Sequence, residues 1–245
     1  MVPTPVLANK KILITGGTSE LGRHFVEKAL AAGARVYFTS FQNRETFCAL
    51  EARGAAGFVL DLADMREIES FVKTLKEKEK TLDIVIHNAA AIRDHTIQNL
   101  SEEEWDYVMT VDLKAPYYLT KKLLPFLFKA EGAKKIFMIT SRAAVAGGFG
   151  ISNYAAAKAG LIGLAKSLAQ ELGKKNILVN AVNPGFMPSK MTHDLPPDVI
   201  QQNLEASPLG QYSSPAEVAD FLLFLCSDQM MQVTGQIFHF EGRKT

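Results

Sequence analysis

The stretch that decides the fold is KILITGGTSELG, residues 11–22, where a short apolar run leads into glycines and then into a helical pattern. Parallel sheets bind ligands beyond the carboxyl ends of their strands, and this glycine cluster directly follows the first strand. Backbone N–H groups at a helix N-terminus attract phosphate, and glycines let the backbone approach it. The stretch therefore predicts a nucleotide phosphate loop, with an ordinary glycine turn as the alternative.

The same alternation of strand and helix patterns continues along the whole chain. Near-continuous apolar runs, typical of strands covered on both faces, occur at 11–15, 35–40, 57–60, 83–87, 135–140, 177–182 and 236–240. Helical patterns lie between them at 21–32, 43–53, 64–80, 101–129, 153–174 and 215–226. The alternation predicts a single-domain, Rossmann-type doubly wound α/β fold over residues 1–245, with a parallel sheet of about seven strands. The irregular segment 184–213 is too long for an ordinary connection and is expected to form a lid.

Local signals mark the ends and faces of several helices. Ser101 with Glu104 three residues later forms a capping box, and Ser214 is expected to cap a helix that begins with Pro215. The run KTLKEKEK, residues 73–80, is dominated by charges of both signs and predicts a solvated helix face.

Composition limits the class of protein. The chain has 245 residues, 47% of them hydrophobic, and a net charge of +1, which suits a globular domain and gives no argument for nucleic acid or an anionic membrane. No apolar run reaches the ~18–20 residues of a membrane span, and the start lacks a signal-peptide pattern, so we expect a soluble cytoplasmic protein. Cys48 and Cys226 lie in apolar helical patterns and are predicted to be core residues in a reducing compartment.

The end of the second strand, FTSFQNR at residues 38–44, bears on the choice of nucleotide. An acidic residue there, about 20 residues past the loop, would bind both ribose hydroxyls of NAD. Ser40 stands in its place and Arg44 follows, which favours a 2′-phosphate and therefore NADP(H); alternatively, Arg44 only begins the next helix and faces water. Asp61, after the third strand, would either accept from the adenine amino group or cap the next helix.

The stretch SNYAAAKAG, residues 152–160, has the most specific chemistry. Tyr154 and Lys158 are four residues apart and share one helix face, where an ammonium would lower the pKa of the phenol. Tyr154 is thus predicted to exchange a proton near neutral pH. Ser141 follows the fifth strand and reaches the same sheet edge, where it could donate to a carbonyl oxygen. Many Tyr–Lys pairs at this spacing lie on a surface, but the alanine-rich surroundings favour close helix packing.

Six stretches together resemble the short-chain dehydrogenase/reductase family in order and spacing. They are TGGTSELG (15–22), LDLAD (60–64), HNAA (87–90), ITS (139–141), YAAAKAG (154–160) and VNAVNPG (179–185). The resemblance extends from Lys10 to Gly242. Within the family, NYAAAKAGLIGLAKSLAQEL and VNAVNPGF look most like the β-ketoacyl carrier-protein reductases of fatty acid synthesis.

The resemblance implies a role for each part of the site. Ser141 would polarise a carbonyl oxygen, Tyr154 would protonate it, and Lys158 would bind the nicotinamide ribose, with Asp112 at a fourth catalytic position. The implied cofactor contacts are Gly16, Thr18, Ser19, Leu21, Gly22, Ser40, Arg44, Asp61, Leu62, Asn88, Ala89, Tyr154, Lys158, Pro184, Gly185 and Ser189. No metal site is expected, and His87 is interpreted as a strand-end residue because no second ligand stands at a suitable spacing.

The sequence departs from the family pattern at four places. Glu20 replaces the middle glycine of the loop, Ala90 replaces a glycine after the fourth strand, Asp112 replaces an asparagine, and the tail reads FEGR at 240–243. Glu20 stabilises a helix N-terminus by ~0.3–1 kcal/mol, yet a diphosphate ~4 Å away would be repelled by about 1 kcal/mol in water and about 4 kcal/mol at a dielectric of 20. An ionised Asp112 would raise the pKa of Tyr154.

Two hypotheses follow. The first is an NADPH-dependent reductase of a carbonyl group, most plainly of a 3-oxoacyl thioester, although a polyketide, sugar or steroid ketone would leave similar marks. The second is a weakly active or non-catalytic subunit that partners an active relative. The resemblance also implies a homodimer or homotetramer that uses the helix at 153–174 and the C-terminal strand. An acidic acyl carrier protein is a possible partner, with Lys129, Lys174 and Lys175 as candidate contacts or simply as cations at helix ends.

Overall fold

The computed structural model describes residues 6–189, 192 and 197–240. Its strands are β1 (Lys11–Ile14), β2 (Arg35–Ser40), β3 (Ala56–Val59), β4 (Ile84–His87), β5 (Lys134–Ile139), β6 (Ile177–Asn183) and β7 (Ile237–His239). They form one sheet in the order β3-β2-β1-β4-β5-β6-β7, and every pair is parallel. The predicted Rossmann-type sheet of about seven strands is confirmed, with strand ends within about two residues of those expected.

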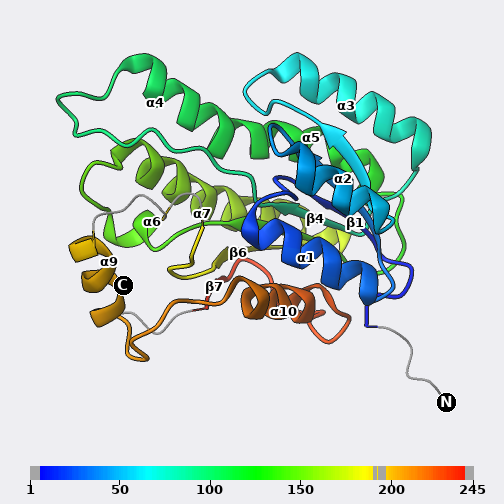
Figure 1. The fold of residues 1–245 in the computed structure, drawn as a ribbon. Coiled ribbons are helices and arrows are strands. Elements are labelled where there is room, and N and C mark those ends of the chain that lie inside the picture. The colour runs from blue at the N-terminus through cyan, green and yellow to red at the C-terminus, as the bar shows by residue number, and fades with distance from the viewer. Residues whose placement is uncertain (1–5, 190–191, 193–196, 241–245) are drawn as a thin grey trace.

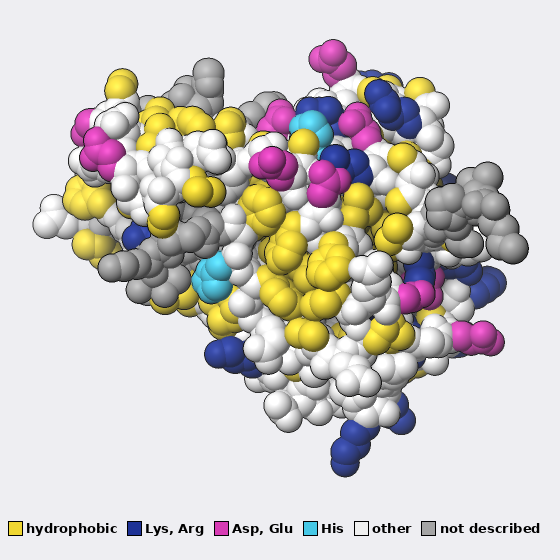
Figure 2. Space-filling view, turned by 90° about the horizontal axis from the view of Figure 1, so that it is seen from below, with side chains coloured by type: hydrophobic (Ala, Val, Ile, Leu, Met, Phe, Trp, Pro, Cys, Tyr) yellow, Lys and Arg dark blue, Asp and Glu magenta, His cyan; other side chains and the backbone are white. Residues whose placement is uncertain are grey.

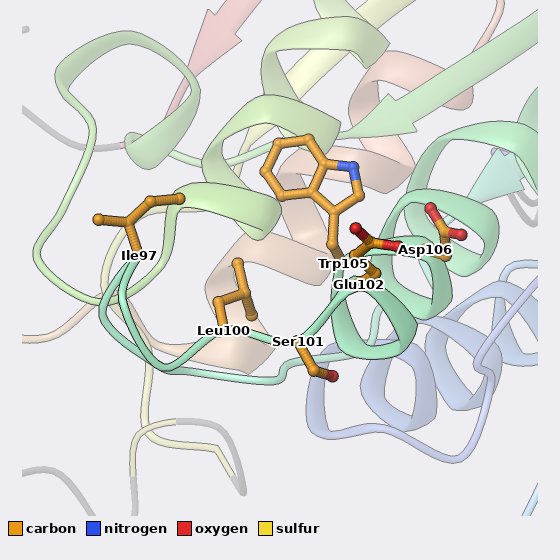
Figure 3. A pocket seen from close by; sticks show the side chains of 6 residues that line it. All are labelled: Ile97, Leu100, Ser101, Glu102, Trp105 and Asp106. Atoms are coloured by element: carbon orange, nitrogen blue, oxygen red, sulfur yellow. The ribbon is translucent and has the colours of Figure 1, made fainter.

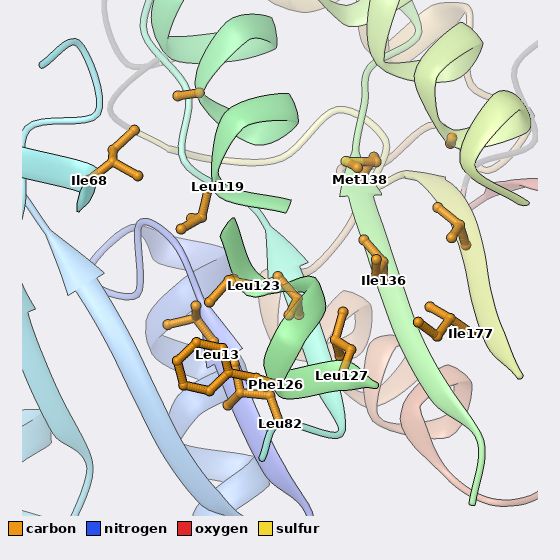
Figure 4. Close-up of a cluster of buried hydrophobic side chains, with 14 of the residues drawn as sticks. Leu13, Ile68, Leu82, Leu119, Leu123, Phe126, Leu127, Ile136, Met138 and Ile177 are labelled. Carbon is orange, nitrogen blue, oxygen red and sulfur yellow. The ribbon is translucent and has the colours of Figure 1, made fainter. Parts of the chain in front are cut away.

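Helices cover both faces of this sheet (Figure 1). They are α1 (Glu20–Ala31), α2 (Arg44–Ala52), α3 (Met65–Lys78), α4 (Glu102–Met109), η1 (Thr110–Lys114), α5 (Ala115–Leu127), α6 (Ala143–Ala146), α7 (Ser152–Leu172), η2 (Gly173–Lys175), α9 (Pro197–Glu205) and α10 (Pro215–Cys226). One buried apolar cluster joins α3, α5 and α7 to the sheet, as Figure 4 shows, and a second joins α1, α2 and α10 to the other face. The core therefore consists of two layers that hold the carboxyl ends of the strands at one rigid edge.

The order of the strands reverses between β1 and β4. The chain runs from β1 outward to β2 and β3, and then returns to β4 on the other side of β1. In a parallel sheet such a reversal opens a crevice beyond the strand ends, which is the usual ligand site of this architecture. The loops after β1 and β4 therefore border a binding crevice.

The predicted helix at 101–129 is interrupted. The capping box of Ser101 and Glu104 is present, but the α-helix gives way to a π-helical turn, η1, before it continues as α5. The Ala115 N–H bonds to the carbonyl of Thr110, five residues earlier. Pro116 has no N–H to give to the carbonyl of Asp112, so the regular ladder cannot run through this point.

Several other expectations are corrected by the packing. Cys226 is buried as predicted, whereas Cys48 is exposed on the outer side of α2. Asp64, and not Asp61, caps α3, and the Ser214 side chain makes no capping hydrogen bond. Glu79, in the run expected to be solvated, is only 6% exposed.

The expected lid at 184–213 contains α9, which the sequence patterns did not predict. Residues 190–191 and 193–196 of this segment lie outside the described residues. At its two ends, the Ser213 N–H bonds to the Phe186 carbonyl at 2.8 Å and the rings of Phe186 and Tyr212 stack at 5.3 Å. The segment thus leaves the sheet and returns to the same place.

Within the described parts of the chain, no helix is long and apolar enough to cross a bilayer.

Candidate active site

The glycine loop connects β1 to α1 at the crevice. Gly16 has a φ of +64°, and a side chain there would come within 2.9 Å of the Ala89 backbone. A Cβ at Gly22 would lie 2.3 Å from the Gly16 carbonyl oxygen. Both positions exclude a side chain, so the loop folds tightly on itself and leaves its outer surface to backbone groups.

Asn88 anchors the loop to the end of β4. Its side-chain amide donates to the carbonyl oxygens of Thr15 and Gly16 at 3.0 Å and to Ser19 Oγ at 3.1 Å. The Thr15 hydroxyl oxygen accepts from the backbone N–H groups of Asn88 and Ala89, each at 3.0 Å. The predicted contacts Asn88 and Ala89 therefore lie at the loop, and the Asn88 side chain supports it from below.

Helix α1 presents its N-terminus to the crevice. Ser19 caps the helix by accepting from the Gly22 N–H, while the N–H groups of Glu20 and Leu21 have no acceptor among the described residues. Free first-turn N–H groups at the positive end of a helix dipole bind phosphate. The donor set fits a dinucleotide diphosphate.

Glu20 turns away from this donor set. Its carboxylate lies 3.4 Å from Arg23 Nη2, one turn along the helix, and its side chain is 47% exposed. The guanidinium offsets part of the negative charge, and water screens the rest. The repulsion between Glu20 and a bound diphosphate should therefore be close to the value in water, about 1 kcal/mol.

The tip of β2 carries the predicted ribose contacts. Ser40 is buried, and its hydroxyl lies 2.6 Å from that of Thr18, which links the strand end to the glycine loop. Arg44 is the first residue of α2 and is exposed. Asp61 accepts from the Ala63 N–H at 2.8 Å in a tight turn after β3, next to the buried Leu62.

The catalytic candidates meet at the carboxyl ends of β4 and β5. Ser141 stands two residues after β5, and its Oγ accepts from the Ala143 N–H at 3.2 Å. Tyr154 and Lys158 lie in the first two turns of α7, with Lys158 Nζ 5.4 Å from the centre of the tyrosine ring. Lys158 is only 2% exposed, so the alternative of a surface pair is wrong.

Asn153 is a supporting residue that the sequence patterns did not reveal. It is fully buried, donates to the Arg93 carbonyl at 2.9 Å and accepts from the Tyr154 N–H at 2.8 Å. It thereby ties the loop after β4 to the start of α7. Only its place beside the tyrosine could have suggested this role.

Lys158 and Asp112 form a buried ion pair. Nζ donates to the Ile139 carbonyl at 3.2 Å and lies 3.1 Å from Asp112 Oδ2. Asp112 Oδ1 accepts from the Ala91 N–H at 2.7 Å. Burial is the largest influence on both groups. It raises the pKa of Asp112 above the usual value although Lys158 opposes the rise, whereas Asp112 and Tyr154 outweigh burial at Lys158 and raise the pKa of its ammonium.

The environment of Tyr154 raises the pKa of its phenol above the ordinary value. Burial is the largest cause, the charge of Lys158 opposes it as predicted, and Asp112 adds to it. A hydrogen bond with Ser141 lowers the pKa, and Asp94, which the sequence analysis missed, raises it. Lys158 lowers and Asp112 raises this pKa as expected, but burial outweighs the lysine, so the net shift is away from the neutral pH that the lysine alone would favour.

The remaining predicted contacts follow β6. Pro184 is buried, Gly185 has a φ of +83° and donates to Asn183 Oδ1, and the Ser189 N–H bonds to Thr192 Oγ1 at 2.9 Å. Because β6 is next to β5, this turn lies at the edge of the sheet that carries Ser141.

His87 has a structural role. Its ring is 2% exposed, Nε2 lies 2.8 Å from Thr120 Oγ1, and burial lowers its pKa to about 3. Among the described residues, no cluster of His, Cys, Asp and Glu is suited to a metal ion.

A separate hollow of about 260 Å³ lies where the preceding loop meets α4. Figure 3 shows that Ile97, Leu100 and Trp105 line it together with the polar residues Ser101, Glu102 and Asp106. It includes none of the catalytic candidates, so we distinguish it from the active site.

Comparisons with known proteins agree with this fold. The sequence profile of a family described as "Enoyl-(Acyl carrier protein) reductase" matches residues 16–242. The chain is 36% identical over 242 residues to the 3-oxoacyl-[acyl-carrier-protein] reductase FabG of Thermotoga maritima, covering 96% of this chain and 98% of that protein. It is 33% identical over 235 residues to the FabG of Escherichia coli K12, covering 95% and 96%. The solved RhlG/NADP active-site complex of Pseudomonas aeruginosa superposes with a TM-score of 0.90 at 28% identity, over 99% of this chain and 98% of that one.

The fold and the site define a nicotinamide-dependent oxidoreductase with a doubly wound sheet. The chain belongs to the short-chain dehydrogenase/reductase family.

Proposed function

We propose that the chain reduces the keto group of a 3-oxoacyl thioester to the 3-hydroxyacyl form with NADPH. The observation that carries the proposal is the convergence of Ser141, Tyr154 and Lys158 at one sheet edge, next to a loop whose free N–H groups suit a diphosphate. The names of the FabG relatives support the substrate class.

The three side chains divide the work on the carbonyl group. Ser141 Oγ already accepts a backbone N–H, so its own proton is left for another acceptor, which is the Tyr154 oxygen in this structure and would be the carbonyl oxygen when a substrate is bound. Tyr154 donates the proton that makes the alcohol, and the Lys158 ammonium stabilises the phenolate left behind. A nicotinamide bound along Gly16, Asn88 and the turn after β6 would supply the hydride.

The phenol pKa suits this direction of reaction. A tyrosine that acts as an acid must be protonated before each turnover, and burial, the largest cause of the raised pKa of Tyr154, keeps it so across the physiological range. The protonated phenol is the form that reduction of a ketone requires.

NADPH is proposed over NADH because of the tip of β2. No carboxylate follows the strand there, Ser40 is tied to Thr18, and Arg44 is exposed at the start of α2, free to meet a 2′-phosphate. Arg44→Ala should weaken binding of NADPH by about tenfold or more while leaving that of NADH unchanged. If Arg44→Ala weakened the binding of NADPH and NADH equally, Arg44 would not be the residue that binds the 2′-phosphate.

The family profile and the relatives name two different reactions, reduction of C=C and of C=O. Ser141 and Tyr154 offer two hydroxyl donors close together. Both can hydrogen-bond to one carbonyl oxygen, which is the atom that must be protonated when a ketone is reduced. The test follows NADPH absorbance with acetoacetyl and crotonyl thioesters in parallel. Turnover of the first alone is expected, and turnover of crotonyl thioester alone would contradict the proposal.

Tyr154→Phe should reduce turnover by at least about 10²-fold without loss of NADPH binding. Tyr117→Phe is the matched control, because Tyr117 is 47% exposed on α5, and it should keep the wild-type rate. If Tyr154→Phe retained full activity, the assignment of the catalytic acid would be wrong.

The non-catalytic alternative is not favoured by the site. The four departures from the family pattern motivate it, but Glu20, which bears most directly on the cofactor, pairs with Arg23 away from the loop N–H groups. Asp112 is fully buried and pairs with Lys158 at 3.1 Å.

We also propose that residues 184–213 form a lid over the substrate. Its two ends are joined by the Phe186–Tyr212 stack, and Leu209 is 76% exposed near its far end. Phe186→Ala should raise KM for the acyl thioester more than that for NADPH. Proportional changes in both constants would indicate a general loss of structure instead.

A homo-oligomer is proposed because of the face around α10. Figure 2 shows apolar side chains gathered over the middle of this face. Phe221 packs against Phe238 and Phe240 near β7, and Phe224 is 45% exposed. Phe224→Glu should lower the molar mass measured by light scattering, and an unchanged mass would argue against this surface.

The acyl carrier protein remains a proposed partner without an assigned contact. Lys174 and Lys175 form the turn η2 after α7, and Asn176 bonds to the start of β5 at Lys134. This is the amino edge of the sheet, opposite the catalytic edge, and Lys129 follows the end of α5 on the same side. These lysines therefore do not border the site of their own chain.

A further inference from the structure

A carboxylate is buried directly behind the catalytic lysine. Asp112 is 0% exposed and stands in the middle of the π-helical turn η1. One of its oxygens is held by the Ala91 N–H, while Oδ2 has no hydrogen bond and lies 3.1 Å from Lys158 Nζ. The carboxylate thus has one anchored oxygen and one that only the ammonium compensates.

The local backbone explains why the carboxylate is at this place. A π turn adds a residue to the helix and rotates the following side chains. Here it directs Asp112 into the sheet edge between the end of β4 and α7, where Ala91 and Lys158 meet it. An unpaired buried carboxylate would be strongly disfavoured, so the pair forms as a unit.

We propose that Asp112 is a positioning residue that holds the Lys158 ammonium by this ion pair and, by compensating its charge, keeps Tyr154 protonated as the acid for ketone reduction. This inference rests on the proposed function and assigns to the side chain of Asp112 a part that the proposed function does not require. Asp112 acts through Lys158 and touches no substrate atom.

The direction in which Asp112 changes the pKa of Tyr154 follows from the charges around the phenol. Lys158 faces Tyr154 from α7, Asp112 from η1, Asp94 from the loop after β4, and Ser141 from the turn after β5. A lone ammonium favours phenolate, and a carboxylate beside it reduces that preference. Removal of the Asp112 charge alone should therefore make Tyr154 easier to ionise.

Asp112→Asn removes the charge and keeps an oxygen for the Ala91 N–H. Its effect is measured on the protein without cofactor, by phenolate absorbance with the Tyr154→Phe signal in the same background subtracted. The ratio of phenolate to phenol at Tyr154 should rise by about tenfold at a given pH, a shift of about one unit. An unchanged ratio, or a lower one, would overturn the proposal.

A second readout is the pH profile of kcat/KM for reduction. Its basic limb should move to lower pH by about one unit in Asp112→Asn. Asp94→Asn is the matched control, because it removes an exposed charge that also faces Tyr154 but has no ion pair with Lys158, and it should shift the limb much less. Equal shifts in both variants would show that the ion pair has no special part.

The wild-type chain provides the test if Asp112→Asn does not fold. Tyr154 in the unliganded wild-type protein should titrate above the ordinary value of about 10. A midpoint clearly below that value would contradict the compensating role. If Tyr154→Phe proved fully active, the proposed function would fail. If Tyr154→Phe were inactive but Asp112→Asn left the pKa of Tyr154 unchanged, only this inference would be refuted.

Discussion

Glu79 offers a direct test of how a buried carboxylate stabilises this fold. It lies immediately after α3 and accepts from Lys11 Nζ at 2.8 Å, the Lys80 N–H at 2.8 Å, Tyr37 Oη at 3.0 Å and Arg35 Nη1 at 3.3 Å. Burial alone would raise its pKa, but these donors lower it from 4.5 to about 2. A difference of that size corresponds to about 3 kcal/mol of folding free energy.

The pH window follows from the sign of the shift. Because the folded-state pKa of Glu79 is lowered, its contribution is complete above pH 4.5 and is lost as the pH falls toward 2. Glu79→Gln should therefore lower the free energy of unfolding at pH 7 by about 2–3 kcal/mol, and the difference from wild type should narrow by about 1 kcal/mol near pH 3.5.

Urea unfolding followed by circular dichroism at both pH values measures these differences. Glu69→Gln is the control, because Glu69 bonds to Lys122 in an exposed pair and should contribute less than about 1 kcal/mol. The reasoning would be refuted if Glu79→Gln cost no more than the control, or if its cost did not change with pH.

Three further predictions concern the phosphate loop and the helix ends. Glu20→Gly should tighten NADPH binding by less than about tenfold in calorimetry, because the carboxylate is exposed and paired; a gain of a thousandfold would place it against the diphosphate. Gly22→Ala should lower stability by about 1–3 kcal/mol and abolish NADPH binding, since its Cβ would meet a carbonyl at 2.3 Å; a variant that bound normally would contradict the tight loop. Ser101→Ala should cost about 1 kcal/mol in urea unfolding and Ser214→Ala almost nothing, because only the first makes a capping bond; equal costs would disprove the distinction.

Much of the fold could be predicted because its signals are local. Continuous apolar runs reveal strands covered on both faces, and strand–helix alternation leaves a parallel sheet as the natural arrangement. The position of the glycine loop after β1, and the spacing of Tyr154 and Lys158 on α7, likewise depend on residues close in sequence.

The burial of Glu79 and the exposure of Cys48 were predicted wrongly from the sequence, because both depend on residues distant along the chain. Glu79 closes a run of exposed charges, yet the chain leaves the helix there in an extended conformation, with φ −141° and ψ 148°, and the side chain turns to β1 and β2. Cys48 lies in an apolar pattern on a helix whose outer side nothing covers within the described residues. Neither outcome is encoded by neighbours along the chain.

In the active site too, some features follow from the sequence and others depend on tertiary contacts. The sequence by itself determined which residue types stand at the carboxyl edge of the sheet, because parallel strands bring their ends together and Ser141, Tyr154 and Lys158 follow from that topology. Only the tertiary structure decided how their charges combine. The π turn brings Asp112 to Lys158, and α1 directs Glu20 toward Arg23, because side-chain direction depends on helix phase and packing and not on order along the chain.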